Sequence, residues 1–280
     1  IQGGMGIGIS LSGLASAVSN EGGIGVISAA AIGMFEPDFA TNYIEANIRA
    51  LKNEIRRARE LTKGILGINI MVALSNFADM AKTAIEEGID VIFSGAGLPL
   101  NLPALLKENT HTKLVPIVSS ARAASLIAKR WVDKYKYAPD AIVVEGPLAG
   151  GHLGFSEDQV SNSAYCLEEL ITQVIQEVSK IEEKAGRAIP VIAAGGIYTG
   201  QDIHKFIKLG ASGVQMATRF VITVECDASD AFKQSYIDCT KENIGIIKSP
   251  VGLPGRAIIN EYLKDVSECH KKPFKCPYHC

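Results

Sequence analysis

The chain has 280 residues, of which 47% are apolar and 21% are charged, and its formal net charge is −2. This composition excludes a disordered, collagen-like or coiled-coil protein, and a nearly neutral chain without basic blocks is a poor electrostatic binder of nucleic acid. No apolar run reaches the ~18 residues that a membrane-spanning helix requires, so we expect neither nucleic acid nor a membrane as a partner.

Eight short runs rich in Ile and Val follow one another along the chain. Each predicts a strand that is buried on both faces, as in a parallel sheet. The runs span residues 1–4, 23–28, 66–72, 90–94, 113–118, 141–145, 189–194 and 213–217.

Helical periods lie between these runs. Apolar residues recur every three or four positions over residues 44–58, 77–85, 167–181 and 203–207. Thr199 and Asp202 have the spacing of a capping box before the last of these helices. Strands that alternate with helices indicate βαβ units, and eight units in about 235 residues favour an α/β protein of the TIM (β/α)8 barrel type over an open Rossmann sheet. The early glycines also miss the G-x-G-x-x-G spacing of that sheet.

The predicted barrel covers residues 1–235, and residues 236–280 are expected to form an irregular C-terminal extension. Both ends of the chain are expected to lack short pieces. Three of the six cysteines, Cys269, Cys276 and Cys280, lie in the extension. Their spacing matches no common zinc or iron–sulfur pattern, so we predict no metal site. This cysteine usage is typical of a reducing, cytoplasmic setting.

Glycine is enriched, with 27 residues, and it gathers where the predicted strands end. Examples are Gly3 with Gly4, Gly150 with Gly151, and the pair at 195–196. The carboxyl ends of barrel strands carry function, and glycine lets backbone N–H groups approach a flat or phosphorylated ligand closely. A βα turn favours glycine even without a ligand, but several such loops on one rim point to a binding site.

The loops after the last two predicted strands form the usual phosphate site of this barrel. Gly195 and Gly196 precede a short helix, and Thr218 could donate its hydroxyl group to a phosphate. Arg219 could be a second donor or could form a structural ion pair, and the sequence leaves both roles open.

His152 is the strongest candidate for catalysis. Of five histidines, it alone lies in a glycine-rich loop at the end of a predicted strand. Histidine titrates near neutrality and can therefore accept or give a proton during turnover. Glu145 closes the strand before this loop and could accept a hydrogen bond from a ring N–H or a hydroxyl group.

At these positions the chain resembles the nitronate monooxygenases, formerly called 2-nitropropane dioxygenases, and their close relatives, the FMN-dependent enoyl-acyl-carrier-protein reductases. The resemblance rests on five segments in the same order, which cover residues 1 to about 225. They are IQGGM at 1–5, GINIM at 67–71, EGPLAGGH at 145–152, IAAGGI at 192–197 and VQMATRF at 214–220.

The resemblance implies FMN as the cofactor and His152 as the active-site histidine. It further implies an FMN site formed by Gly4, Met5, Asn69, Glu145, Gly150, Gly195, Gly196, Gln215, Met216, Ala217 and Thr218. Two places depart from the family pattern. Ala217 stands where the family usually has glycine, and Pro147 with Leu148 is unusual before the glycine-rich loop.

The resemblance also implies an oxidoreductase that acts on a small molecule. In the leading interpretation, alkyl nitronates or nitroalkanes are oxidised with O2 to carbonyl compounds and nitrite, and His152 takes the α-proton of a neutral nitroalkane or holds the nitro group. The alternative is an FMN- and NAD(P)H-dependent enoyl-acyl-carrier-protein reductase. A flavin-binding, redox-responsive protein without turnover is the third interpretation. The oligomeric state, including a homodimer, stays open.

Overall fold

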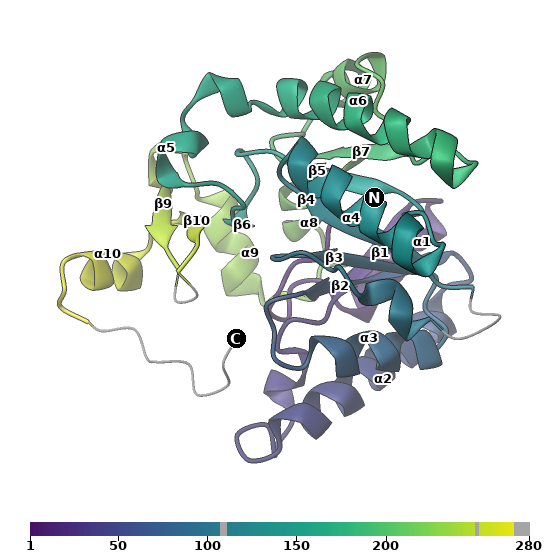
Figure 1. Ribbon diagram of the computed structural model, residues 1–280. Helices are drawn as coiled ribbons and strands as arrows, with labels where there is room; N and C mark the ends of the chain where they lie inside the picture. Colours follow the sequence, from purple (N-terminus) through teal and green to yellow (C-terminus); the bar gives the residue numbers. More distant parts are fainter. Residues whose placement is uncertain (107–110, 250–251, 272–280) are drawn as a thin grey trace.

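A computed structural model describes residues 1–106, 111–249 and 252–271 (Figure 1). Its centre is a seven-stranded parallel sheet with the strand order β1-β2-β3-β4-β5-β7-β8. The strands are β1 (Ile24–Ser28), β2 (Ile65–Met71), β3 (Val91–Gly95), β4 (Lys113–Val118), β5 (Ile142–Glu145), β7 (Val191–Ala194) and β8 (Gly213–Gln215).

The N-terminal segment closes this sheet into a barrel. Gln2 forms a parallel bridge with Met216, just beyond β8. The Gln2 N–H group donates to the carbonyl oxygen of Ile24, at the start of β1, over 3.0 Å. The segment therefore lies between the first and last strands of the sheet. It takes the place of the strand predicted at residues 1–4, although only Gln2 pairs like a strand residue.

Helices cover the outer face of the barrel, because most of them connect the end of one parallel strand to the start of the next (Figure 1). The α-helices are α1 (Ser12–Asn20), α2 (Tyr43–Leu61), α3 (Phe77–Glu86), α4 (Ala121–Tyr135), α5 (Glu157–Val160), α6 (Leu167–Ala185), α7 (Gly200–Lys208), α8 (Thr218–Val221), α9 (Asp230–Ile237) and α10 (Glu261–Ser267). Short 3-10 helices occur at η1 (Ile32–Phe35), η2 (Leu102–Leu105), η3 (Ser163–Tyr165) and η4 (Lys241–Asn243).

The apolar core has two separate parts. The larger part lies between the strands and the helices and includes Ile68, Ile92 and Trp131, all fully buried. The smaller part fills the inside of the barrel with one or two side chains from each of several strands. These are Val26, Val91, Phe93, Val115, Val143, Ile192 and Ala194. Strands buried on both faces account for the continuous apolar runs in the sequence.

The predicted (β/α)8 barrel is confirmed, and the capping box of Thr199 and Asp202 is present at the start of α7. The C-terminal extension differs from the expected irregular tail. Its described residues form β9 (Ile244–Lys248), β10 (Pro254–Ile258) and helix α10. These strands join β6 (Gly151–His152) in a second sheet with the order β6-β10-β9. β10 pairs with β9 as a hairpin and with β6 on its other side, and this pairing satisfies backbone groups that a loop would leave to water.

In the described part of the chain, no helix has both the length and the apolar character needed to cross a membrane.

Candidate active site

The inside of the barrel changes from apolar to polar toward the carboxyl ends of the strands. Side chains alternate along a strand, so Asn69 faces inward like Gly67, where an added Cβ atom would lie 2.7 Å from the ring of Phe93. By the same alternation Glu145 follows Val143 of the inner core. Glu145 pairs with Ala194, and Ala194 pairs with Gln215. A polar inner layer therefore lies above the apolar one.

The polar side chains of this layer have no partners in the protein. Among the described residues, no hydrogen bond or ion pair involves the side chains of Asn69, Glu145 or Gln215. Gln215 is nevertheless buried, and Asn69 and Glu145 are half-buried. Buried polar groups are normally hydrogen-bonded, so three free groups in one layer indicate a place for a polar ligand.

Burial raises the pKa of Glu145 from 4.5 to about 7, and no neighbouring charge opposes the shift. The carboxyl group is thus poised between its neutral and charged forms near neutral pH. It can donate a hydrogen bond as the acid or accept one as the carboxylate. A ligand that offers a ring N–H group would favour the charged form.

The predicted glycines Gly3 and Gly4 bring the backbone close to two members of this layer. A Cβ atom at Gly4 would lie 2.5 Å from the Cβ atom of Asn69, and one at Gly3 would lie 3.3 Å from the side-chain amide of Gln215. Met5 follows directly, and its N–H group donates to the hydroxyl group of Ser10 over 2.7 Å. The segment that closes the barrel therefore also borders the polar layer.

The predicted phosphate loops lie at the ends of β7 and β8. Gly195 and Gly196 have φ angles of 94° and 76°, a left-handed conformation that favours glycine. After β8, Met216 binds the N-terminal segment, Ala217 precedes α8, and Thr218 is the first residue of that helix. The N–H groups of a first helical turn lack intrahelical acceptors, so both loops can offer donors to an anion.

Arg219 is held by contacts within the protein, although it forms no ion pair with any of the described residues. Its Nη1 atom donates to the Tyr198 carbonyl oxygen over 2.9 Å. Its guanidinium group lies 4.8 Å from the centre of the Tyr198 ring. Arg219 thus joins the loop after β7 to the start of α8.

His152 lies in an exposed segment between two buried anchors. Ala149 and Leu153 are 6% and 1% exposed. A Cβ atom added to Gly150 or Gly151 would meet nothing within 4 Å. The imidazole ring has no partner among the described residues, and partial burial lowers the pKa of His152 below its usual value. The ring is therefore neutral at pH 7 and able to accept a proton.

Sequence reasoning missed Arg256, which contacts the His152 loop from β10. Its Nη2 atom donates to the Pro147 carbonyl oxygen over 2.9 Å, and its Nε atom donates to that of Ala149 over 3.2 Å. The signal that could have been used is the pair of short runs at 244–247 and 256–259, each with two or three Ile residues and separated by Gly and Pro, which is typical of a hairpin. Nothing in the sequence alone indicates which loop that hairpin binds.

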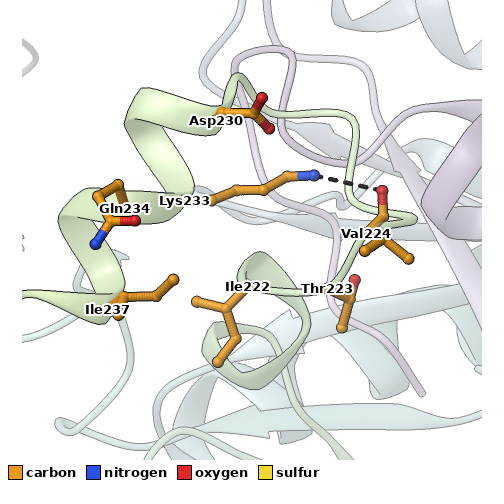
Figure 2. Close-up of a pocket in the computed structure, with 7 residues that line it drawn as sticks. All are labelled: Ile222, Thr223, Val224, Asp230, Lys233, Gln234 and Ile237. Atoms are coloured by element: carbon orange, nitrogen blue, oxygen red, sulfur yellow. Dashed lines mark hydrogen bonds between the residues drawn. The ribbon is translucent and has the colours of Figure 1, made fainter.

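A surface groove lies apart from these residues, between the end of α8 and helix α9. Its volume is about 340 Å³, and it is lined by Ile222, Thr223, Val224, Asp230, Lys233, Gln234 and Ile237. Figure 2 shows Lys233 extended along it toward the Val224 carbonyl oxygen, 3.4 Å away. None of the predicted site residues lines this groove.

The described residues contain no cluster of three or more His, Cys, Asp or Glu side chains that could hold a metal ion. Cys269 is exposed. The other two cysteines of the tail, Cys276 and Cys280, lie outside the described residues.

Comparison with known proteins identifies the relatives of this chain. The family model described as nitronate monooxygenase matches residues 1–279. A probable nitronate monooxygenase of Staphylococcus aureus is 28% identical over 91% of this chain and 74% of its own length. A relative from Mycobacterium tuberculosis, (3aS,4S,5R,7aS)-5-hydroxy-7a-methyl-1-oxo-octahydro-1H-indene-4-carboxyl-CoA dehydrogenase, is 26% identical over 90% of this chain. The match spans 60% of that relative's length.

Among solved structures, FabK from Thermotoga maritima is similar with a TM-score of 0.74 and 29% identity. The similarity covers 99% of this chain and 75% of FabK. The shared architecture therefore includes the C-terminal strands β9 and β10 as well as the barrel.

Proposed function

The chain belongs to the nitronate monooxygenase family, and we propose that it is an FMN-dependent oxidoreductase that oxidises alkyl nitronates or nitroalkanes with O2 to carbonyl compounds and nitrite. The observation that carries this proposal is the polar inner layer of the barrel. Asn69, Glu145 and Gln215 offer free hydrogen-bonding groups there, next to loops suited to an anion. A flavin mononucleotide has a polar ring system and a phosphate, and it matches both parts.

The residues fit this cofactor by their chemistry. The amides of Asn69 and Gln215 can both donate and accept hydrogen bonds, and Glu145 can accept one from a ring N–H group. Because residues 195 and 196 are glycines, no side chain covers their backbone N–H groups, which stay accessible to the phosphate. Ala217 adds one methyl group where the family usually has glycine, but its N–H group remains. Bound FMN would supply the electron transfer, which the side chains of this site cannot.

His152 is the proposed base. A neutral imidazole nitrogen can take the α-proton of a neutral nitroalkane, and the resulting imidazolium can donate a hydrogen bond to the nitronate oxygen. The lowered pKa of His152 favours the neutral form that this step needs. A nitronate that arrives already deprotonated requires no base, so His152 would only orient it.

Two features favour the enoyl thioester reductase as the second candidate. The Mycobacterium tuberculosis relative is named as a dehydrogenase of a CoA ester. In addition, apolar side chains stand exposed in loops at the carboxyl ends of the strands, notably Phe35 at 71% and Leu148 at 62%. Such a rim suits an acyl chain at least as well as a small nitroalkane.

One anaerobic reduction experiment on a single FMN-loaded sample distinguishes the nitronate monooxygenase from the enoyl thioester reductase. The purified protein is loaded with FMN, made anaerobic and mixed in parallel with NADH, NADPH and an alkyl nitronate such as ethyl nitronate, while flavin absorbance is followed. We expect rapid bleaching by the nitronate and little by either nicotinamide. Rapid bleaching by NAD(P)H alone would instead establish the reductase. A protein that cannot be loaded with FMN would contradict both candidates.

A further inference from the structure

The loop that carries His152 is built into the C-terminal sheet. In β6, Gly151 pairs with Arg256 of β10, and His152 pairs with Gly255. One residue further, the Leu153 N–H group donates to the Pro254 carbonyl oxygen over 2.8 Å. Figure 1 shows β6 beside the β9–β10 hairpin, at the edge of the barrel. The backbone of His152 is thus held by residues about one hundred positions away.

The side chain of Arg256 holds the first half of the same loop. Its two donated bonds end on the carbonyl oxygens of Pro147 and Ala149, and both partners are backbone atoms. No carboxylate pairs with Arg256 among the described residues. A planar guanidinium fork can span two carbonyls of one turn, whereas the ammonium of lysine acts as a point donor.

Apart from the backbone bonds to β10 and the side chain of Arg256, the loop has little to fix it. Gly150 and Gly151 have no neighbour within 4 Å of a Cβ position, and Gly151 has a φ of 73°. Glycine has the greatest backbone freedom of all residues. The bonds from β10 and the buried side chains of Ala149 and Leu153 therefore limit where the His152 ring can lie.

We propose that Arg256 is a positioning residue for His152, so that the β9–β10 hairpin is a working part of the candidate active site. This inference rests on the proposed role of His152 as a base. Arg256 acts through the shape of the loop, because it binds carbonyl oxygens rather than the imidazole ring. We therefore expect the geometry of the guanidinium group of Arg256, and not its positive charge, to determine its effect on the site.

The test compares Arg256→Met, Arg256→Lys and the control Lys248→Met in the purified, FMN-loaded chain. Lys248 is exposed on β9 and pairs with Pro254, so its loss removes a positive charge from the same hairpin without touching the loop. Amide hydrogen exchange at Leu153 and NMR titration of the His152 ring are the main readouts, and neither requires turnover. Exchange reports local opening directly.

For Arg256→Met we expect exchange at Leu153 to speed up by about 10-fold or more, while exchange in β2 and β7 stays unchanged. The pKa of His152 should rise toward its ordinary value, because a released loop exposes the ring to water. Arg256→Lys should behave like the Met variant, and Lys248→Met like the wild type. Turnover of a neutral nitroalkane should fall more than turnover of a preformed nitronate.

Unchanged exchange at Leu153 together with an unchanged His152 pKa would overturn the proposal. So would full rescue by lysine, or an equal loss of protection throughout the barrel. If the Met variant does not fold, Arg256→Gln supplies a smaller planar donor for the same measurements. If His152→Ala leaves turnover intact while Arg256→Met still releases the loop, the proposed role of His152 as a base is wrong, but Arg256 does hold the loop.

Discussion

The side chain of Gln2 hydrogen-bonds to both polar backbone groups of Val26. The Val26 N–H group donates to Gln2 Oε1 over 2.9 Å, and Gln2 Nε2 donates to the Val26 carbonyl oxygen over 3.3 Å. Gln2 is fully buried and Val26 is 1% exposed. A side-chain amide thus replaces part of the backbone pairing between the N-terminal segment and β1, where the barrel closes.

We predict that Gln2→Leu lowers the free energy of unfolding by about 1–3 kcal/mol, because it leaves a buried N–H group and a carbonyl unpaired. Urea unfolding followed by circular dichroism measures the change. Gln201→Leu, at an exposed position of α7, is the control and should cost less than about 0.5 kcal/mol. Equal stability of the Gln2 variant and the wild type would show that closure does not depend on this amide.

Sequence patterns were sufficient for the seven strands of the parallel sheet, but not for β6, β9 and β10. Runs such as 66–72 and 141–145 are largely apolar without alternation, which is typical of strands buried on both faces. Because parallel strands end on one rim, the order of strands placed Glu145 and the glycine-rich loops at one end of the barrel, whereas Asn69 was implied only by the family resemblance.

The long-range bonds could not be predicted from sequence. Arg256 binds carbonyl oxygens 107 and 109 residues away. Every residue has a backbone carbonyl, so the sequence does not indicate which of them a side chain binds. Gln2 was predicted as an ordinary strand residue, because the sequence pattern does not reveal that its side chain replaces part of the backbone pairing with β1. Such contacts depend on how the finished elements dock, not on local spacing.

Asp227 caps a distant helix. Its carboxylate accepts hydrogen bonds from the N–H groups of Leu11, Gly13 and Leu14 at the start of α1, at 2.7, 3.0 and 3.1 Å. We predict that Asp227→Ala costs about 1–2 kcal/mol, as the loss of a helix N-cap does. Urea unfolding tests this against Glu225→Ala, an exposed neighbour. If the two variants lose equal stability, charge near α1 matters rather than the cap.

Glu145 should make stability depend on pH. Its pKa is about 7 in the folded chain, against the ordinary glutamate value of 4.5 that it regains on unfolding. The folded state therefore binds the proton more tightly, so the free energy of unfolding is highest below pH 4.5 and falls as pH rises to about 7. In the FMN-free protein, Glu145→Gln should remove this fall. Unfolding curves of both proteins at about pH 5 and about pH 8 measure it, and identical pH dependence would contradict the raised pKa.

Gly196 lies against Leu148. A Cβ atom at Gly196 would meet the Leu148 Cβ atom at 2.9 Å, and its φ of 76° is strained for alanine. Gly186, with a φ of 68° and nothing within 4 Å, supplies the matched control for strain alone. We expect Gly186→Ala to cost about 1 kcal/mol and Gly196→Ala clearly more.

The same substitution should weaken FMN binding, because the loop after β7 must shift to admit the methyl group. Fluorescence titration should show a Kd raised by about 10-fold for Gly196→Ala and unchanged for Gly186→Ala. Adding Leu148→Gly should restore part of the loss, since it removes the Cβ atom that the new methyl group meets but not the strain at residue 196. No recovery in the double variant would place the damage in the backbone conformation alone.

His152→Ala tests the proposed base. We predict that FMN stays bound while kcat/KM for a neutral nitroalkane falls by about 10²–10⁴-fold, the usual contribution of a general base. In the wild type, kcat/KM should rise with pH through the lowered pKa of His152 and level off above it, because the neutral ring is the active form.

The His152→Ala variant should lose this pH dependence and keep more activity with preformed nitronate, which has no α-proton to lose. His204→Ala, an exposed histidine on α7, should match the wild type. A variant at 152 that turns over neutral nitroalkane at the wild-type rate would remove His152 from the reaction.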